Sequence, residues 1–499
     1  MSIRSLTSPL IGSVAGGLIA GGVPATPFSP TDISGLQGWW NPKDTGTLWE
    51  DTSATTAATT DVARMDDNSD NDYYFTSTSE PVTGGTINST NALTFNGTKN
   101  MVQGDIKSSG WTGLTLSMVY QPSSLSGIDY LMDQSPGSNG FLFRTDGNKI
   151  EGGAFDATNG LVFVESAVQA LVTGTPALLT LRVGSHGVEI WRNGILYALD
   201  TSDSLSSIVS VGSGSLILGA ESGGNRAVGD IGEVILYDHS ITDSELASLH
   251  TYLNGRSGTG STFTDKKAFL LIGQSNMVGR DSNDSGANYP EGTLQYDQDG
   301  TIRAAISPLD HHDAGAGTMG LAKQYAIDYQ AANTNTQIVF LPYAKGETGF
   351  AAGDWEKGDF YYEAAVDAAN DYFAANPSVT LEQILVQLGE TDAQDGNTNF
   401  AADMDQFIAD LRSDITAADS TTPLTWGGMV PSWASVDVNA RLSVQADIED
   451  VGNRNPYTAY VSSAGLTDRG DDIHFDNTSV RTLGSRHYTA LATAKANTP

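Results

Sequence analysis

A segment rich in Gly, Ser and Thr, residues 255–265, divides the chain into two parts with different hydrophobic patterns. Before it, short apolar or alternating runs follow one another between turn residues, which predicts β structure. After it, apolar runs alternate with longer segments of helical periodicity, which predicts a parallel sheet covered by helices. A chain of 499 residues is also too long for one hydrophobic core. We therefore expect domains at residues 36–254 and 266–499, with residues 255–265 as a linker.

The first 35 residues are rich in Gly, Pro and Ser and differ from both domains. They favour an N-terminal arm that docks on a partner. A signal peptide is the alternative, because Arg4 precedes the small apolar stretch 10–23. Several glycines dilute the hydrophobicity of that stretch, so the arm is the favoured interpretation.

Residues 36–254 predict a β sandwich or jelly roll, because many short strand-like runs occur there without helices between them. Asn193-Gly194 lies between two such runs and is a hairpin signal. One helix closes the section, and Thr242 and Glu245 have the spacing of a capping box at its start. The clearest strand-like runs are 114–120, 141–143, 178–183, 188–191 and 215–218.

Residues 266–499 predict an α/β domain with three layers, because strands and helices alternate along the chain. In such domains the chemistry lies at the carboxyl ends of the strands. We expect strands at 268–273, 338–343, 384–388, 424–429 and 458–462 and helices near 319–331, 360–375, 398–416, 436–449 and 478–495.

Charge and composition exclude several classes of function. The chain carries 59 acidic and 25 basic residues, a net charge of -34, and such a field repels nucleic acid and anionic membranes. It has no cysteine, so disulfides, thiol catalysis and cysteine-bound metals are excluded. No segment approaches the ~20 apolar residues of a membrane helix. We therefore expect neither a nucleic-acid partner nor membrane insertion.

A serine and a histidine stand where an α/β domain places its reactive groups. Ser275 follows the apolar run 268–272, and Asp471 precedes His474 by three residues, just before the last predicted helix. A serine becomes a nucleophile when a base removes its proton, and the base needs an acceptor that fixes its tautomer. We predict that Ser275 is the nucleophile, His474 the base and Asp471 the orienting group. Asp472 remains an alternative to Asp471.

Two further loops follow predicted strands at the same edge. Gly346 lies in a Lys-Gly-Glu-Thr block, and its N–H is expected to line an oxyanion hole. The block Gly389-Glu390-Thr391-Asp392 is expected to form another wall of the pocket. The candidate substrate-pocket residues are Gln274, Asn276, Gln387, Glu390 and Trp355.

The order of four short motifs, Gly-Gln-Ser-Asn-Met, Lys-Gly-Glu-Thr, Gly-Glu-Thr-Asp and Asp-x-x-His, resembles the SGNH hydrolase superfamily over about residues 266–495. The chain is most similar to its sialate O-acetylesterase and acetylxylan esterase type of carbohydrate esterase. This resemblance implies a flavodoxin-like fold and hydrolysis of acetyl esters on sugars through an acyl-serine, with no metal or other cofactor. It implies that Ser275 contributes its own N–H to the oxyanion hole beside that of Gly346, and it gives His474 and Asp471 the roles stated above.

One motif departs from the pattern of this branch. The branch carries Gln-Gly-Glu, whereas this chain has Gln387-Leu388-Gly389-Glu390. Leu388 cannot donate a hydrogen bond, and Gln387 is expected to point to the opposite face of its strand. The loss of one oxyanion donor typically costs about 10²–10³ in rate, so this departure predicts weak activity.

Two nearby features have competing interpretations. His311 and His312 stand between Asp310 and Asp313, but four ligands in direct succession cannot converge on one ion. We therefore expect a solvated loop and no metal site. Trp355 lies near the Gly346 loop, where it either flanks a sugar or packs in the core.

The segment 230–238, with the capped helix after it, resembles the end of concanavalin A-like, laminin-G-like jelly rolls. The similarity covers about residues 90–254 and implies a lectin-like domain that binds glycans or only packs. Together the two resemblances predict a serine esterase that removes O-acetyl groups from a surface polysaccharide.

The setting favoured by the arm and the composition is a bacteriophage virion, as a tail or surface-fibre protein acting on host glycans. Residues 1–35 would then bind other virion proteins or form a homo-oligomer. One alternative is a secreted bacterial carbohydrate acetylesterase. Another is a non-catalytic structural or adhesive virion protein with a decayed esterase domain, and Leu388 supports that interpretation.

Overall fold

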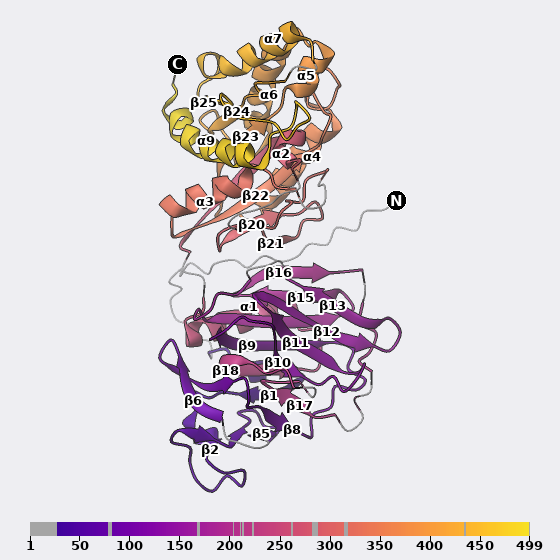
Figure 1. The fold of residues 1–499 in the computed structure, drawn as a ribbon, viewed down its shortest axis with the longest axis vertical. Coiled ribbons are helices and arrows are strands. Elements are labelled where there is room, and N and C mark those ends of the chain that lie inside the picture. Colours follow the sequence, from indigo (N-terminus) through magenta and orange to yellow (C-terminus); the bar gives the residue numbers. More distant parts are fainter. Residues whose placement is uncertain are drawn as a thin grey trace, which may run out of the picture. The chain divides into compact units, whose positions relative to one another are not determined.

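The structure is a computed structural model in which the chain divides into two compact units, residues 1–261 and 262–499 (Figure 1). It describes residues 27–498 apart from 78–81, 167–169, 203, 210, 212–213, 222–223, 261–262, 282–287, 314–317 and 434–435. Most of the expected N-terminal arm therefore lies outside the described residues.

Within the described residues, the first unit consists of two nine-stranded antiparallel sheets and one long helix. One sheet has the order β16 (Ile195–Asp200), β15 (Gly187–Arg192), β14 (Ala177–Gly184), β9 (Leu114–Pro122), β18 (Val228–Tyr237), β7 (Thr90–Asn96), β6 (Val82–Ile87) and β3 (Asp61–Val62), with β1 (Leu36–Trp40) paired to β18. The other has the order β13 (Gly160–Glu165), β12 (Lys149–Asp156), β11 (Phe141–Asp146), β10 (Ile128–Asp133), β17 (Leu216–Leu218), β8 (Met101–Gln103), β5 (Tyr74–Ser77), β4 (Arg64–Asp66) and β2 (Leu48–Trp49). Two single-turn helices, η1 (Pro30–Asp32) and η2 (Thr45–Thr47), precede most of these strands.

The two sheets share one core, as expected for a β sandwich. Leu116 and Met118 of one sheet and Phe141 and Phe143 of the other belong to the same buried cluster. The Asn193-Gly194 turn joins β15 to β16 with positive φ at both residues, 53° and 81°, which is the type I′ geometry that suits a hairpin.

Helix α1 (Asp243–Ser257) begins as its sequence predicts. The side chain of Thr242 accepts a hydrogen bond from the N–H of Glu245, and the carboxylate of Glu245 accepts one from the N–H of Thr242. The helix extends into the segment expected to be a linker, because its last turn packs Leu253 against the sandwich and ends at Gly258 in the left-handed region.

The second unit is built on one seven-stranded sheet within the described residues. Its order is β21 (Ile302–Ala304), β20 (Thr293–Tyr296), β22 (Thr336–Ala344), β19 (Asp265–Gly273), β23 (Thr380–Gln387), β24 (Leu424–Gly427) and β25 (Thr458–Val461). Only the pair β20–β21 is antiparallel. The helices are α2 (Ser275–Val278), α3 (Ala322–Ala332), α4 (Phe360–Ala375), α5 (Glu390–Asp395), α6 (Phe400–Asp414), α7 (Val438–Glu449), α8 (Val451–Arg454) and α9 (Asn477–Ala496).

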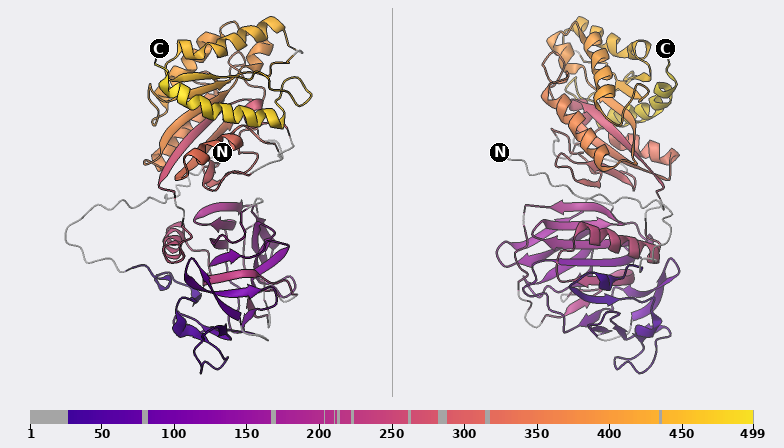
Figure 2. Two further views of the ribbon diagram at one scale, coloured as in Figure 1. Left: turned by 60° about the vertical axis from the view of Figure 1, so that its left-hand side comes forward. Right: turned by 180° about the vertical axis from the view of Figure 1, so that it is seen from behind.

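Helices cover both faces of this sheet, as Figure 2 shows for yellow α9 on one side and the orange helices on the other. Two consecutive residues of β24 contact helices on opposite faces of the sheet. The hydroxyl of Thr425 hydrogen-bonds Nδ1 of His487 in α9 at 2.8 Å. The indole of Trp426 packs on Phe400 and Phe407 of α6. Because both faces are buried, β19 is apolar from Ala268 to Ile272 rather than alternating.

The order of the sheet brings three strand ends together. β19 lies between β22 and β23, and Gly273 at its end is in register with Ala344 and Gln387. The β20–β21 hairpin is an addition at the β22 edge. The remaining strands have the order 2-1-3-4-5, and in doubly wound sheets the ligand site lies where the strand order reverses.

Candidate active site

Ser275 is the first residue of α2 and is largely buried, with 6% of its surface exposed. The turn before it requires glycine. Gly273 has φ of 149°, and a Cβ there would lie 2.2 Å from the carbonyl oxygen of Gln387. Glycine therefore lets β19 approach β23 closely, and the chain then turns so that Ser275 stands at the carboxyl edge of the sheet.

The structure brings Ser275 and His474 together although they are 199 residues apart. Nε2 of His474 lies 2.9 Å from Oγ of Ser275, and Nδ1 lies 2.8 Å from Oδ2 of Asp471. The backbone N–H of His474 also donates to Asp471, at 2.9 Å. The loop before α9 therefore carries the histidine and its carboxylate partner as one unit.

The partner at Nδ1 determines which ring nitrogen of His474 carries the proton. Partial burial opposes ionisation of Asp471, but hydrogen bonds from His474 and Arg469 hold the pKa of its carboxyl well below the usual range. An ionised carboxylate can only accept, so Nδ1 of His474 is the protonated nitrogen. Nε2 is then free to accept the hydroxyl proton of Ser275, which is the tautomer that a general base needs.

Asp472 does not share this position. It is exposed, has φ of 70°, and its N–H donates to Asp468. The structure therefore places Asp471 rather than Asp472 against the histidine. A partner that the sequence pattern missed is Arg469, whose Nε donates to Asp471 at 2.6 Å; its position two residues before the carboxylate was the available signal.

The N–H of Gly346 already has a partner, contrary to its expected role in an open oxyanion hole. It donates to Oδ2 of Asp313 at 3.1 Å, and the same carboxylate contacts Arg280 at 2.5 Å and Lys345 at 3.4 Å. Burial opposes ionisation of Asp313, but Arg280 and Lys345 hold its pKa below the usual range. An oxyanion would have to replace this carboxylate at the Gly346 N–H.

The candidate pocket residues are not open to a substrate. Gln274, Asn276, Gln387 and Glu390 are each at most 2% exposed. Nε2 of Gln387 donates to the carbonyl oxygen of Gly428 at 3.1 Å, so its side chain reaches toward β24. The other three side chains are joined to one another in a hydrogen-bonded network.

Leu388 is fully buried, and its carbonyl oxygen accepts a hydrogen bond from Nε1 of Trp426 at 2.8 Å. Its side chain supplies no polar group, as the sequence predicts. The departure from the family pattern is therefore accommodated by packing between β23 and β24.

Trp355 is a core residue and does not flank the pocket. Its side chain is fully buried, its Nε1 donates to Oγ1 of Thr348 at 2.9 Å, and its ring packs on Phe407. The interpretation of this residue as a sugar contact is wrong, because the loop after β22 turns the indole inward between α4 and α6.

Replacing Trp355 with alanine should destabilise the second unit by about 3–5 kcal/mol, the usual cost of removing a large buried aromatic side chain. Denaturant unfolding measures the change. Phe360→Ala is the matched control, because Phe360 is 71% exposed and its removal should change the free energy of unfolding by at most about 0.5 kcal/mol. Equal effects of the two variants would contradict the assignment of Trp355 to the core.

The paired histidines are not in a solvated loop. His311 is buried, with 4% exposed. The ring of His312 packs on Tyr343 near the end of β22 and on Phe360 and Tyr361 at the start of α4. Sequence reasoning missed this cluster, because the aromatic partners lie some 30 to 50 positions away along the chain.

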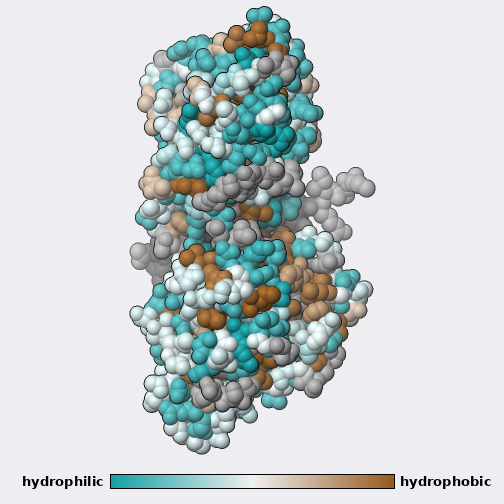
Figure 3. All heavy atoms as spheres, in the orientation of Figure 1, coloured by the Kyte–Doolittle hydropathy of each residue, from teal (hydrophilic) through white to brown (hydrophobic). Residues whose placement is uncertain are grey.

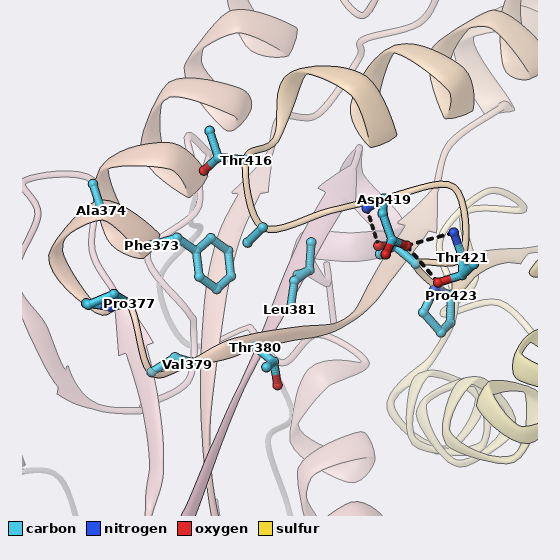
Figure 4. Close-up of a pocket in the computed structure, with 12 residues that line it drawn as sticks. Phe373, Ala374, Pro377, Val379, Thr380, Leu381, Thr416, Asp419, Thr421 and Pro423 are labelled. Carbon is cyan, nitrogen blue, oxygen red and sulfur yellow. Dashed lines mark hydrogen bonds between the residues drawn. The ribbon is translucent and has the colours of Figure 1, made fainter. Parts of the chain in front are cut away.

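A cavity of about 520 Å³ lies at the opposite end of the sheet (Figure 4). Thr380 and Leu381 at the start of β23 line it, together with Pro423 before β24 and Phe373 near the end of α4. It is therefore separate from the residues around Ser275. Among the described residues, no group of three or more His, Cys, Asp or Glu side chains could hold a metal ion.

In the part of the chain that the structure describes, none of the helices has the length and apolar character needed to span a bilayer. The faces of the two units visible in Figure 3 mix hydrophilic and hydrophobic residues.

A serine, a histidine and an ionised aspartate in this hydrogen-bonded series, at the carboxyl edge of a parallel sheet, have the geometry of serine hydrolases. Comparison with protein families shows which kind of hydrolase this part of the chain resembles. Residues 265–493 match the family described as carbohydrate esterase, sialic acid-specific acetylesterase. The resemblance to carbohydrate esterases is thereby confirmed at the level of the family for this part of the chain. No curated protein matches the chain.

Several solved structures are similar to parts of the chain. One is a protein from Arabidopsis thaliana, with 20% identity, a TM-score of 0.40, and coverage of 46% of this chain and 98% of that one. Another is NanS, with 15% identity, a TM-score of 0.39, and coverage of 46% and 97%. A third is the receptor binding domain of botulinum neurotoxin type G, with 11% identity, a TM-score of 0.32, and coverage of 46% and 53%.

Proposed function

We propose that the second unit is a serine esterase that removes O-acetyl groups from a glycan. The observation that carries the proposal is the contact of 2.9 Å between Oγ of Ser275 and Nε2 of His474. The family match over residues 265–493 supports the acetyl group and the sugar as substrate. The 2-1-3-4-5 order of the main strands supports the flavodoxin-like fold that such an enzyme is expected to have.

The reaction follows from the positions of the protons. Oγ of Ser275 attacks the acetyl carbonyl carbon while Nε2 of His474 takes the hydroxyl proton. The tetrahedral intermediate expels the sugar oxygen, which takes that proton from His474, and leaves acetyl-Ser275. A water molecule then attacks the acetyl group, His474 takes its proton and returns it to Ser275, and acetate departs. Asp471 keeps Nδ1 protonated and stabilises the imidazolium formed in each half.

Release of acetate from O-acetylated sugars is the direct test of this function. We expect the purified chain to release acetate from acetylated glycans and from p-nitrophenyl acetate, at rates lowered by the missing third oxyanion donor. No acetate above the uncatalysed background from any of these esters would reject the proposal and favour a decayed esterase domain.

The charges beside the site support an anionic sugar. Arg280 and Lys345 lie against Asp313 next to Gly346, although the chain as a whole carries a net charge of -34. A sugar carboxylate would be attracted to these two cations. O-acetylated sialic acid and neutral acetylated xylan are therefore the substrates to compare, and we expect the sialic acid to be preferred.

The exposed Phe360 supports a substrate longer than one sugar. Its ring contacts Tyr361 and His312, and His312 contacts Tyr343 at the end of β22, so this cluster lies at the edge that carries Ser275. An exposed aromatic ring there offers a flat apolar surface to the C–H face of a neighbouring sugar. Phe360 thus takes the role of sugar contact that was expected of the buried Trp355.

Phe360→Ala should raise KM for an acetylated polysaccharide about two- to tenfold, because aromatic contacts contribute about 0.5–1.5 kcal/mol. KM for p-nitrophenyl acetate should stay unchanged, since this ester carries no second sugar for the ring of Phe360 to contact. Steady-state kinetics on both substrates measure the difference. A parallel rise for both would show that the variant disturbs the site itself.

The biological setting remains part of the proposal. The two stacked antiparallel sheets of the first unit support a lectin-like, concanavalin A-like domain that holds a polysaccharide. The Gly, Pro and Ser-rich residues 1–35 support a docking arm on a virion, as in a phage tail or fibre that deacetylates host glycans. A secreted bacterial carbohydrate acetylesterase is the alternative setting for the same chemistry.

A further inference from the structure

Glu390 forms hydrogen bonds with the residues on both sides of Ser275. It is the first residue of α5 and only 1% exposed. Its Oε1 accepts a hydrogen bond from Nδ2 of Asn276 at 2.6 Å, and its Oε2 accepts one from Nε2 of Gln274. One buried carboxylate therefore fixes the residues immediately before and after the nucleophile.

Asn276 in turn forms hydrogen bonds with the residues on both sides of His474. Its Nδ2 also donates to the carbonyl oxygen of Ile473 at 3.0 Å, and its Oδ1 accepts the N–H of Phe475 at 3.1 Å. The two loops that must meet for catalysis are thus joined by a single amide side chain. Glu390 and the carbonyl oxygen of Ile473 both require the nitrogen of this amide on their side, and the N–H of Phe475 requires its oxygen.

We propose that Glu390 is a positioning residue that holds the nucleophile turn and the histidine loop in register through Asn276. This inference rests on the proposed function. Glu390 is too buried to meet a sugar, and it bonds the neighbours of Ser275 rather than its hydroxyl, so it acts through other groups. A displacement of about 1 Å between reacting groups can cost about 10² in rate, so the register of the two loops matters to the reaction.

The burial of the Glu390 carboxylate disfavours its charged form, and a positioning role would explain why a charged residue occupies this place. Burial raises the pKa of Glu390, and the hydrogen bonds from Asn276 and from the two glutamines, Gln387 and Gln274, oppose that rise. A buried charge is often replaceable by apolar residues without loss of stability. A hydrophobic residue would fill the same space but would remove one of the three hydrogen bonds that hold the amide of Asn276.

Glu390→Gln tests the inference with little change in volume. The new amide turns a donor toward the amide nitrogen of either Asn276 or Gln274, so the hydrogen bond to that residue is lost. We expect kcat for p-nitrophenyl acetate to fall about 10- to 100-fold, with KM within about twofold of the wild type. Glu233→Gln is the matched control. Glu233 is also buried and bonded, to Trp39 and Arg256 in the first unit, and its replacement should leave kcat unchanged.

Asn276→Ala and the double variant distinguish positioning from a general loss of structure. If Glu390 acts through Asn276, the double variant should be no slower than Asn276→Ala alone, because the effects of residues in one network do not add. A double variant whose kcat falls by the product of the two single-variant reductions would overturn the inference. Thermal unfolding of each variant identifies any that fail to fold.

Phosphonylation by a fluorophosphonate keeps this test independent of the substrate. The reagent reacts with an activated serine whether or not the enzyme hydrolyses acetyl esters. If wild type releases no acetate but is phosphonylated at Ser275, the proposed function fails. The inference is then supported by slower phosphonylation of Glu390→Gln. A wild-type rate in Glu390→Gln would overturn it, as would an unreactive Ser275 in the wild type.

Discussion

Ser275→Ala should abolish ester hydrolysis, with kcat for p-nitrophenyl acetate reduced about 10⁵- to 10⁶-fold. The reason is that, among the residues that the structure describes, Ser275 carries the hydroxyl that contacts Nε2 of His474, at 2.9 Å. Without it, no acyl-enzyme forms and only residual binding effects remain. Acetate release and p-nitrophenol release both measure the loss, and the folded state should persist because a small hydroxyl is removed without a cavity.

The matched control is Ser485→Ala. Ser485 lies on α9 and its hydroxyl donates to Asp328, away from the strand ends that carry the site. Its replacement should leave kcat within about twofold of the wild type, as is usual for surface positions. Equal background rates in the wild type and in Ser275→Ala would mean that the second unit is not an esterase, and the adhesive or structural interpretation would then apply.

The elements that could be predicted from the sequence are those whose signal is local or periodic. Five successive apolar residues predict the buried strand β19, and the capping pair Thr242 and Glu245 predicts the start of α1. The proximity of Ser275 and His474 could also be predicted from the sequence. Ser275 follows strand β19 and His474 precedes helix α9, and both positions lie at the carboxyl edge of a parallel sheet. Sheet topology then brings together residues 199 positions apart.

What the sequence could not supply is the direction of individual side chains. Trp355, Asn276 and Glu390 all lie near the strand ends, as expected, but each points into the protein instead of toward a substrate. The partner of the Gly346 N–H is Asp313, 33 residues earlier in a different loop. No periodic pattern encodes such a contact, because it depends on how two irregular loops pack.

Short edge elements were missed for a different reason. The hairpin β20–β21 consists of strands of four and three residues, too short for alternation to stand out from a loop. It extends the sheet beyond β22, and the loop after it brings His312 and Asp313 to the site. The neighbourhood of Gly346 therefore depends on an insertion that hydrophobic periodicity does not reveal.

Asp471→Asn should lower kcat about 10⁴-fold while leaving the fold intact. The carboxylate accepts the Nδ1 proton of His474 at 2.8 Å. An asparagine can present its amide nitrogen to the ring instead, which favours the tautomer with the proton on Nε2. That tautomer cannot accept the hydroxyl proton of Ser275, so the base is lost although every side chain stays in place.

The pH dependence of stability gives a second measure of the same contact. Hydrogen bonds from His474 and Arg469 outweigh partial burial and hold the pKa of Asp471 below its usual value of 3.8. A lowered carboxyl pKa contributes stability above the usual value, and this contribution is lost as pH falls toward the lowered pKa. The wild type should therefore be more stable than Asp471→Asn above about pH 5, and the difference should shrink below about pH 4.

Asp472→Asn is the control for this pair of measurements. Asp472 is exposed, its φ of 70° suits asparagine as well as aspartate, and its side chain is not the one that contacts His474. It should keep kcat and the stability profile of the wild type. Loss of activity in Asp472→Asn with retention in Asp471→Asn would transfer the orienting role to the neighbouring carboxylate and require the loop before α9 to rearrange when substrate binds.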